Sequence, residues 1–145
     1  MNAAVVSPAP LSISGRGVFL PGDRYAPERA GEAARDAALR ADHPARNLAA
    51  WIAAELAQNA VRHSRSGDRR GELVVHVAAD PYMLRIEVTD LGPRLERPSA
   101  PVAAPIPRTP GVAVRGLTLV SMYTRDWGYT DHPIGSRSVW AVIEA

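Results

Sequence analysis

The chain has 145 residues, of which 46% are hydrophobic and 22% are charged, the profile of one ordinary globular domain. It contains no cysteine, which excludes disulfides and thiolate metal sites and is typical of a reducing, cytoplasmic setting. Its seventeen basic residues exceed the acidic residues by two, and this small excess argues against direct nucleic-acid binding. All seventeen are arginine, which excludes mechanisms that need a lysine, including the P-loop.

The N-terminal 14 residues lack the basic start and long apolar run of a signal peptide, and no later run is long enough to cross a membrane. We expect residues 1–14 to be a flexible segment in front of one domain, residues 15–145. The apolar residues 17–20 predict a short strand that ends at Pro21-Gly22.

Two helices are predicted next. The first begins near Pro27, which suits the first turn of a helix, and it ends at about Asp42, just before His43-Pro44. The second spans about residues 45–63. Its apolar residues recur every four positions, at Leu48, Ile52 and Leu56.

The second half of the chain predicts two pairs of strands separated by a proline-rich segment. Alternating apolar residues in 72–77 and 84–89 indicate an antiparallel hairpin. Six prolines exclude regular structure from 91 to 112, a helix is expected over 114–123, and strands over 127–130 and 137–143 close the domain. This order of elements predicts an α+β layered sandwich.

The second predicted helix carries the strongest local motif. At 3.6 residues per turn, Glu55, Asn59 and His63 lie on one side, beside the apolar stripe. An asparagine oxygen is a suitable ligand for Mg²⁺, and a glutamate can act as a base. By itself, however, the spacing is more often that of a solvated helix flank with ordinary polar residues.

Asp90 and Gly92 follow the second hairpin strand. Strand alternation places Asp90 on the same face as the apolar residues, where a buried carboxylate requires a partner such as an exocyclic amine. Gly92 would allow close backbone approach to a ligand. The alternative is that Asp90 simply starts the loop.

A third segment, residues 111–117, joins the proline-rich region to the following helix. Its glycines could present backbone N–H groups to phosphate, and Arg115 adds a cationic group. Such a junction is more often an ordinary connection between a loop and a helix.

In this order, the segments resemble the GHKL (Bergerat-fold) ATPase superfamily, and in particular small bacterial anti-sigma-factor serine/threonine kinases. The helix motif from Glu55 to Ser64 is similar to the family's N box, and Asp90-Leu91-Gly92 to its adenine-binding Asp-x-Gly box. Similar segments follow the ATP lid and close the domain: Arg115-Gly116-Leu117-Thr118-Leu119-Val120, Trp127-Gly128 and Gly135 to Ala141.

The resemblance implies a two-layer sandwich whose mixed, mainly antiparallel sheet is covered on one face by helices, with a proline-rich ATP lid at about 91–115. It implies ATP and Mg²⁺ as cofactors. By position, the roles implied are Glu55 as catalytic base, Asn59 as magnesium ligand, Asp90 and Gly92 at the adenine, Arg115, Gly116 and Leu117 near the phosphates, and Ser138 at the adenine through water.

Two positions depart from the family pattern. Val114 replaces the first lid glycine, and a β-branched residue does not adopt a positive φ at low cost. Pro93-Arg94 also continues the Asp-x-Gly box without its second glycine. The first departure places efficient phosphoryl transfer in question, while the fold expectation is unaffected.

The resemblance therefore implies a cytoplasmic kinase that phosphorylates a STAS-domain anti-anti-sigma partner. It also implies binding of a sigma factor and regulation of transcription by partner switching. Relatives commonly form homodimers, so a homodimer is a further expectation. The alternative is a regulatory binding module that sequesters a sigma factor or other partner with little or no catalysis. Retention of Glu55 and Asn59 favours the kinase, whereas Val114 favours the module.

Overall fold

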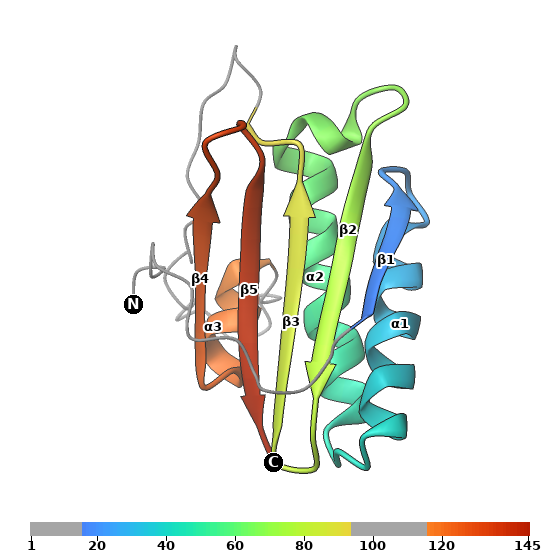
Figure 1. Cartoon of the computed structure of the whole chain (residues 1–145), viewed down its shortest axis with the longest axis vertical. Coiled ribbons are helices and arrows are strands. Elements are labelled where there is room, and N and C mark those ends of the chain that lie inside the picture. Colours follow the sequence, from blue (N-terminus) through green and yellow to red (C-terminus); the bar gives the residue numbers. More distant parts are fainter. Residues whose placement is uncertain (1–15, 94–115) are drawn as a thin grey trace, which may run out of the picture.

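A computed structural model describes residues 16–93 and 116–145. The described chain is an α+β structure, as predicted (Figure 1). The expected flexible N-terminal segment and most of the expected lid lie outside the described residues. In chain order, the elements are β1 (Arg16–Pro21), α1 (Ala26–Arg40), α2 (Arg46–His63), the short 3-10 helix η1 (Arg65–Gly67), β2 (Glu72–Ala79), β3 (Met83–Asp90), α3 (Leu117–Tyr123), β4 (Asp126–Asp131) and β5 (Arg137–Glu144).

The five described strands form one sheet in the order β1-β2-β3-β5-β4. All four neighbouring pairs are antiparallel, so the expected mixed sheet is not found among the described strands. The reason is local, because short turns join β2 to β3 and β4 to β5 and reverse the chain. The last strand, β5, lies between β3 and β4 and extends the same alternation of directions.

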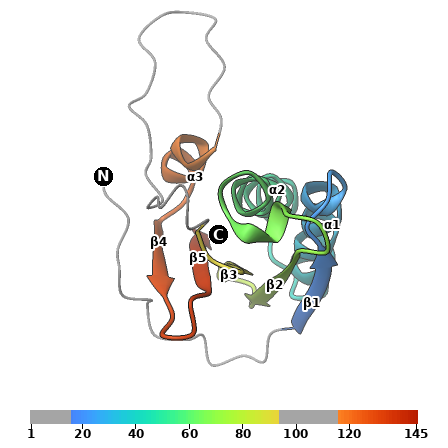
Figure 2. The same ribbon diagram turned by 90° about the horizontal axis from the view of Figure 1, so that it is seen from above.

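The three helices lie on one face of the sheet, as predicted (Figure 2). Alternate residues of the strands point toward them, and on β3 these are the fully buried Leu84, Ile86 and Val88. Burial of such side chains contributes about 1.5–3 kcal/mol each. Among the described helices, none combines the length and the apolar character needed to cross a lipid bilayer.

Small residues let α1 and α2 pack closely. The buried face of α1 consists of alanines at every fourth position together with Gly31. A Cβ atom at Gly31 would lie 3.0 Å from the carbonyl oxygen of Ala50 on α2. On α2, Ile52 and Leu56 are fully buried, which confirms the predicted apolar stripe. This packing fixes the rotation of α2, and therefore fixes which of its side chains face outward.

Candidate functional site

The outer side of α2 lines a cleft that collects the predicted polar residues of this helix. The cleft has a volume of about 250 Å³, and Glu55 and Asn59 lie in its wall. Both residues are partly buried, because they flank the apolar stripe and do not lie opposite to it. The described residues that line the cleft are Glu55, Gln58, Asn59, Arg62, His63 and Gly116.

Gly116 reaches this cleft from a distant part of the chain. Its backbone N–H donates a hydrogen bond of 3.0 Å to Oε2 of Glu55. Gly116 is also the residue before α3, with φ of 65° and ψ of −145°, a conformation that is essentially restricted to glycine. The predicted phosphate-binding glycine and the predicted base are thus in direct contact. The neighbouring predictions, Arg115 and the altered lid position Val114, lie outside the described residues.

Leu117 does not contribute its side chain to the cleft wall. It is the first residue of α3, is 5% exposed and belongs to the hydrophobic core. Three other residues of the wall received no predicted role: Gln58, Arg62 and His63. They follow Glu55 by three, seven and eight positions, and residues at such spacings share a side of a helix. This spacing could have predicted that they lie beside Glu55.

Asp90 lies at the end of β3 on the face covered by helices, as strand alternation predicted. It is 4% exposed, and its Oδ1 accepts a hydrogen bond of 2.7 Å from the N–H of Gly92. Burial raises the pKa of Asp90 from 3.8 to about 6, although the Gly92 hydrogen bond and the nearby Arg137 act in the opposite direction. Within residues 16–93 and 116–145, its second oxygen receives no hydrogen bond.

Gly92 is enclosed by the protein itself. Its φ is 89°, and a Cβ atom there would lie 1.9 Å from the carbonyl oxygen of Gly135 in the β4–β5 turn. On this side, the Cα of Gly92 therefore meets the protein backbone, which by itself requires a glycine here. The predicted contact of Gly92 with the adenine stays a prediction.

Hydrogen bonds tie the end of β3 to the end of α2. The N–H of Arg65 donates to the carbonyl of Gly92 at 2.9 Å, and Ser64 forms a bridge with Pro93. Because a helix rises about 1.5 Å per residue, Asn59 is ~7.5 Å from Ser64 along the axis of α2. The cleft and Asp90 are therefore neighbouring regions, although Asp90 and Gly92 are not part of the cleft wall.

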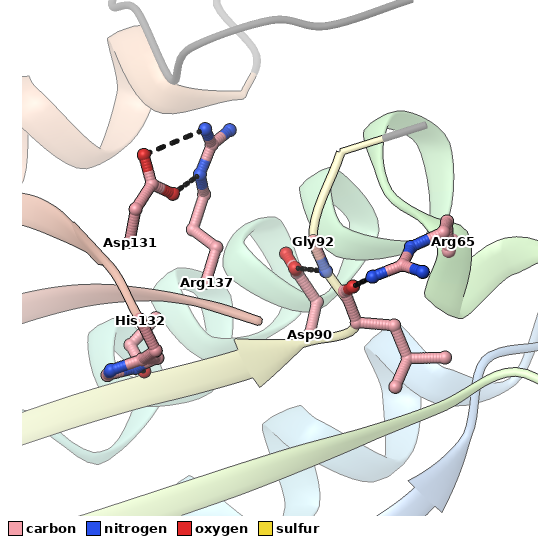
Figure 3. Close-up of polar contacts among 8 residues, drawn as sticks. Arg65, Asp90, Gly92, Asp131, His132 and Arg137 are labelled. Carbon is pink, nitrogen blue, oxygen red and sulfur yellow. Dashed lines mark hydrogen bonds and ion pairs between the residues drawn. The ribbon is translucent and has the colours of Figure 1, made fainter. Parts of the chain in front are cut away.

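Charged residues that the sequence did not single out surround Asp90 (Figure 3). Arg137 is directly opposite Asp90 in the pairing of β3 with β5. Its guanidinium forms a bidentate ion pair with Asp131 of β4, at 2.5 Å and 3.2 Å. Arg65 donates to the carbonyl of Leu91. Both arginines lie near enough to lower the pKa of Asp90, whereas Asp131 raises it.

Ser138 lies on the opposite face of the sheet from Asp90, and its predicted contact with the adenine through water stays a prediction. Its hydroxyl is 2.8 Å from that of Thr89 and 2.7 Å from Nε2 of His132. The physical reason is the register of the strands: Arg137 is the partner of Asp90, and the next residue along β5 points to the other side.

The oxygen atoms of the cleft are chemically suitable for Mg²⁺. Magnesium prefers oxygen ligands and is commonly held by one or two protein side chains together with phosphate groups. Glu55 and Asn59 provide a carboxylate and an amide oxygen on one side of one helix. In the described part of the chain, no group of three or more His, Cys, Asp and Glu residues is arranged to hold a metal.

No protein-family model and no curated protein matches this chain.

Proposed function

We propose that this chain is a Bergerat-type member of the GHKL superfamily that binds ATP with Mg²⁺ and acts as a serine/threonine kinase of the anti-sigma-factor type. The acceptor would be a serine or threonine of a STAS-domain anti-anti-sigma partner. One observation carries the proposal, namely that Glu55, Asn59 and Gly116, predicted from two distant segments, line one cleft.

Each residue has a chemical role that follows from its position. The amide oxygen of Asn59 would hold the metal, and the N–H of Gly116 would donate to a phosphate oxygen. Asp90 would accept a hydrogen bond from the exocyclic amine of adenine. When bound, Mg²⁺ supplies positive charge that stabilises the transferred phosphoryl group.

Phosphoryl transfer requires a base at the acceptor hydroxyl. Glu55 would take the proton while the acceptor oxygen bonds to the γ-phosphorus and the bond to the bridging oxygen of ADP breaks. The carboxylate must leave Gly116 to do so, because its Oε2 accepts that N–H in this structure. The same N–H would then be available to a phosphate oxygen.

The Glu55–Gly116 hydrogen bond also favours the second candidate function. A carboxylate that remains bonded to Gly116 cannot accept the proton of a substrate hydroxyl through the same oxygen. Together with Val114 in the sequence, this contact supports a regulatory module that binds a sigma factor or another partner and transfers phosphate slowly or not at all.

Calorimetric titration with ATP tests the binding function. Wild-type protein should bind ATP with micromolar affinity in the presence of Mg²⁺ and more weakly with EDTA. Asn59→Ala should weaken binding by about tenfold or more, since a metal ligand is lost. Asn47→Ala is a matched control, because Asn47 is an exposed asparagine about three turns earlier on α2. Wild-type protein that does not bind ATP would rule out both nucleotide binding and the kinase.

Transfer of labelled phosphate to a STAS-domain protein from the same genome separates the two candidates. In Glu55→Gln the amide oxygen still accepts the Gly116 N–H but no longer acts as a base. The kinase proposal therefore predicts that ATP binding is retained. It also predicts that the rate of phosphoryl transfer is reduced by about 100-fold or more. Full-rate transfer by this variant would contradict the base assignment, and ATP binding by wild type without transfer would support the module.

A further inference from the structure

Three charged residues form a row across the sheet at the end of β3. Arg137 of β5 pairs in register with Asp90 of β3 on one side and with Asp131 of β4 on the other. Directly opposed side chains in an antiparallel sheet have Cβ atoms about 4.5–5.5 Å apart, so Arg137 is within reach of both carboxylates.

Arg137 pairs with the exposed carboxylate of this row and not with the buried one. Its Nε and Nη2 bind the two oxygens of Asp131, whose side chain is 55% exposed. Figure 3 shows the ion pair and, separately, the Asp90 carboxylate bonded to the Gly92 amide. Tyr129 further fixes the arginine, because its ring centre is 5.2 Å from the guanidinium carbon.

The pairing of Arg137 with Asp131 is unexpected, because Asp90 is the more buried of the two carboxylates. The attraction between a cation and a carboxylate is stronger when the carboxylate is buried, since solvent screens an exposed pair. Asp90 nevertheless accepts one backbone N–H from Gly92, and its second oxygen receives no hydrogen bond from the residues that the structure describes. An ionised carboxylate only accepts hydrogen bonds, so this second oxygen can still accept one from a donor group of a ligand.

We propose that Asp131 is a positioning residue that holds Arg137 away from Asp90 and so keeps the second oxygen of Asp90 available to the amine of a nucleobase. This inference rests on the proposed nucleotide site. Arg137 supplies a positive charge near the carboxylate without occupying it, and Asp131 determines where the guanidinium lies.

Among the residues that the structure describes, two further charged or titratable groups near Asp90 do not take the place of Asp131. Arg65 of η1 approaches Asp90 from the side of α2 and is engaged with the carbonyl of Leu91. His132 in the β4–β5 turn contacts Ser138 on the opposite face of the sheet. Within residues 16–93 and 116–145, Asp131 is therefore the carboxylate whose ion pair with Arg137 competes with Asp90.

Asp131→Asn is the central test, and it should leave the fold intact because the side chain is largely exposed. When the ion pair with Asp131 is lost, Arg137 should move onto Asp90, and the dissociation constant for ATP should increase about tenfold. Asp131→Glu should restore most of the affinity. Asp126→Asn removes an exposed carboxylate from the same strand, far from Arg137, and should leave ATP affinity unchanged.

A double substitution separates movement of Arg137 from simple loss of charge. If Arg137 blocks Asp90 in the Asp131→Asn protein, adding Arg137→Gln should recover ATP affinity to the level of Arg137→Gln alone. Equal losses in the two backgrounds would overturn the inference, as would an Asp131→Asn protein that binds ATP like wild type. Thermal unfolding of each variant verifies that it remains folded.

Carbon NMR titration of Asp90 provides an arm that needs no nucleotide. Asp131→Asn should lower the pKa of Asp90 by about one unit, and the change should be much smaller in the Arg137→Gln background. If wild type does not bind ATP, the proposed function fails, and this titration still decides whether Asp131 controls Arg137. An unchanged titration of Asp90 in Asp131→Asn would overturn the inference.

Discussion

The cleft on α2 and the surroundings of Asp90 are neighbouring regions that differ in how much solvent reaches their side chains. In the cleft, Glu55 and Asn59 are partly solvated and line about 250 Å³ of open space. Asp90, by contrast, is 4% exposed, and the backbone at Gly135 closes one side of the neighbouring Gly92. Substitutions in the cleft should therefore reduce stability less than substitutions at the end of β3.

Glycine substitutions give the largest expected contrast between the two regions. Gly92→Ala should destabilise the protein by about 4 kcal/mol, because the new Cβ would combine an unfavourable positive φ with a 1.9 Å approach to the Gly135 carbonyl. Gly116→Ala should cost about 2 kcal/mol, since it has the φ strain and no atom within 4 Å of the new Cβ. Urea unfolding measures both. Equal losses would show that Gly92 is not enclosed as described.

The pH dependence of stability is expected to be the next largest effect. The pKa of Asp90 is about 6 in the folded protein and 3.8 ordinarily, so the native carboxyl retains its proton to higher pH. This contribution is fully present below about pH 4 and is lost as pH rises through 6, a difference of about 3 kcal/mol. In Asp90→Asn this decline should be absent, as measured by urea unfolding from pH 4 to 8.

Asp80 also makes stability depend on pH, and its contribution must be separated from that of Asp90. The hydrogen bond from the Tyr82 amide is the main cause that lowers the pKa of Asp80. Its contribution is present above the ordinary pKa and is lost as pH falls, which is the opposite direction. Because both proteins contain Asp80, it cancels in their difference, and parallel curves for wild type and Asp90→Asn would contradict the burial of Asp90.

Ser138→Ala tests which face of the sheet belongs to the site. The change removes contacts with Thr89 and His132, so it should destabilise the protein by about 1–2 kcal/mol. ATP affinity should be unchanged, because the hydroxyl lies on the face away from Asp90. A loss of ATP affinity in a folded Ser138→Ala protein would support the predicted contact of this residue with the adenine through water.

Substitutions of Glu55 should have the smallest effect on stability. Glu55→Ala removes the acceptor of the Gly116 N–H and should cost about 1 kcal/mol, whereas Glu55→Gln retains an acceptor and should change the free energy of unfolding by less than about 0.5 kcal/mol. Chemical unfolding of the two variants side by side measures the difference. Identical values would show that the hydrogen bond contributes nothing in solution.

Local sequence patterns were sufficient to predict most of the helices and strands and the places of Glu55 and Asn59 on α2. The four-residue recurrence that includes Ile52 and Leu56 determined the orientation of α2, and so placed Glu55 and Asn59 beside the core. Strand alternation likewise placed Asp90 on the buried face. Both inferences use one element at a time, and the structure confirms these placements.

The remaining features depend on contacts between distant segments. Alternation could not determine the face of Ser138, because β5 is buried on both sides, with Val139 on one and Trp140 on the other. No local pattern relates Gly116 to Glu55, which are 61 positions apart. The same holds for Arg137, whose role follows from strand neighbours that only the sheet order reveals.

The position of β5 has a consequence for the order of folding. This strand is the last in sequence, yet it lies between β3 and β4 and carries Arg137. During synthesis, β1, β2 and β3 can pair as soon as they emerge, whereas β4 has no neighbour in the sheet until β5 is made. Asp90 can therefore acquire its neighbour Arg137 only once β5 has been made. Until β5 pairs, the edge of β3 is exposed and Asp90 lacks this arginine.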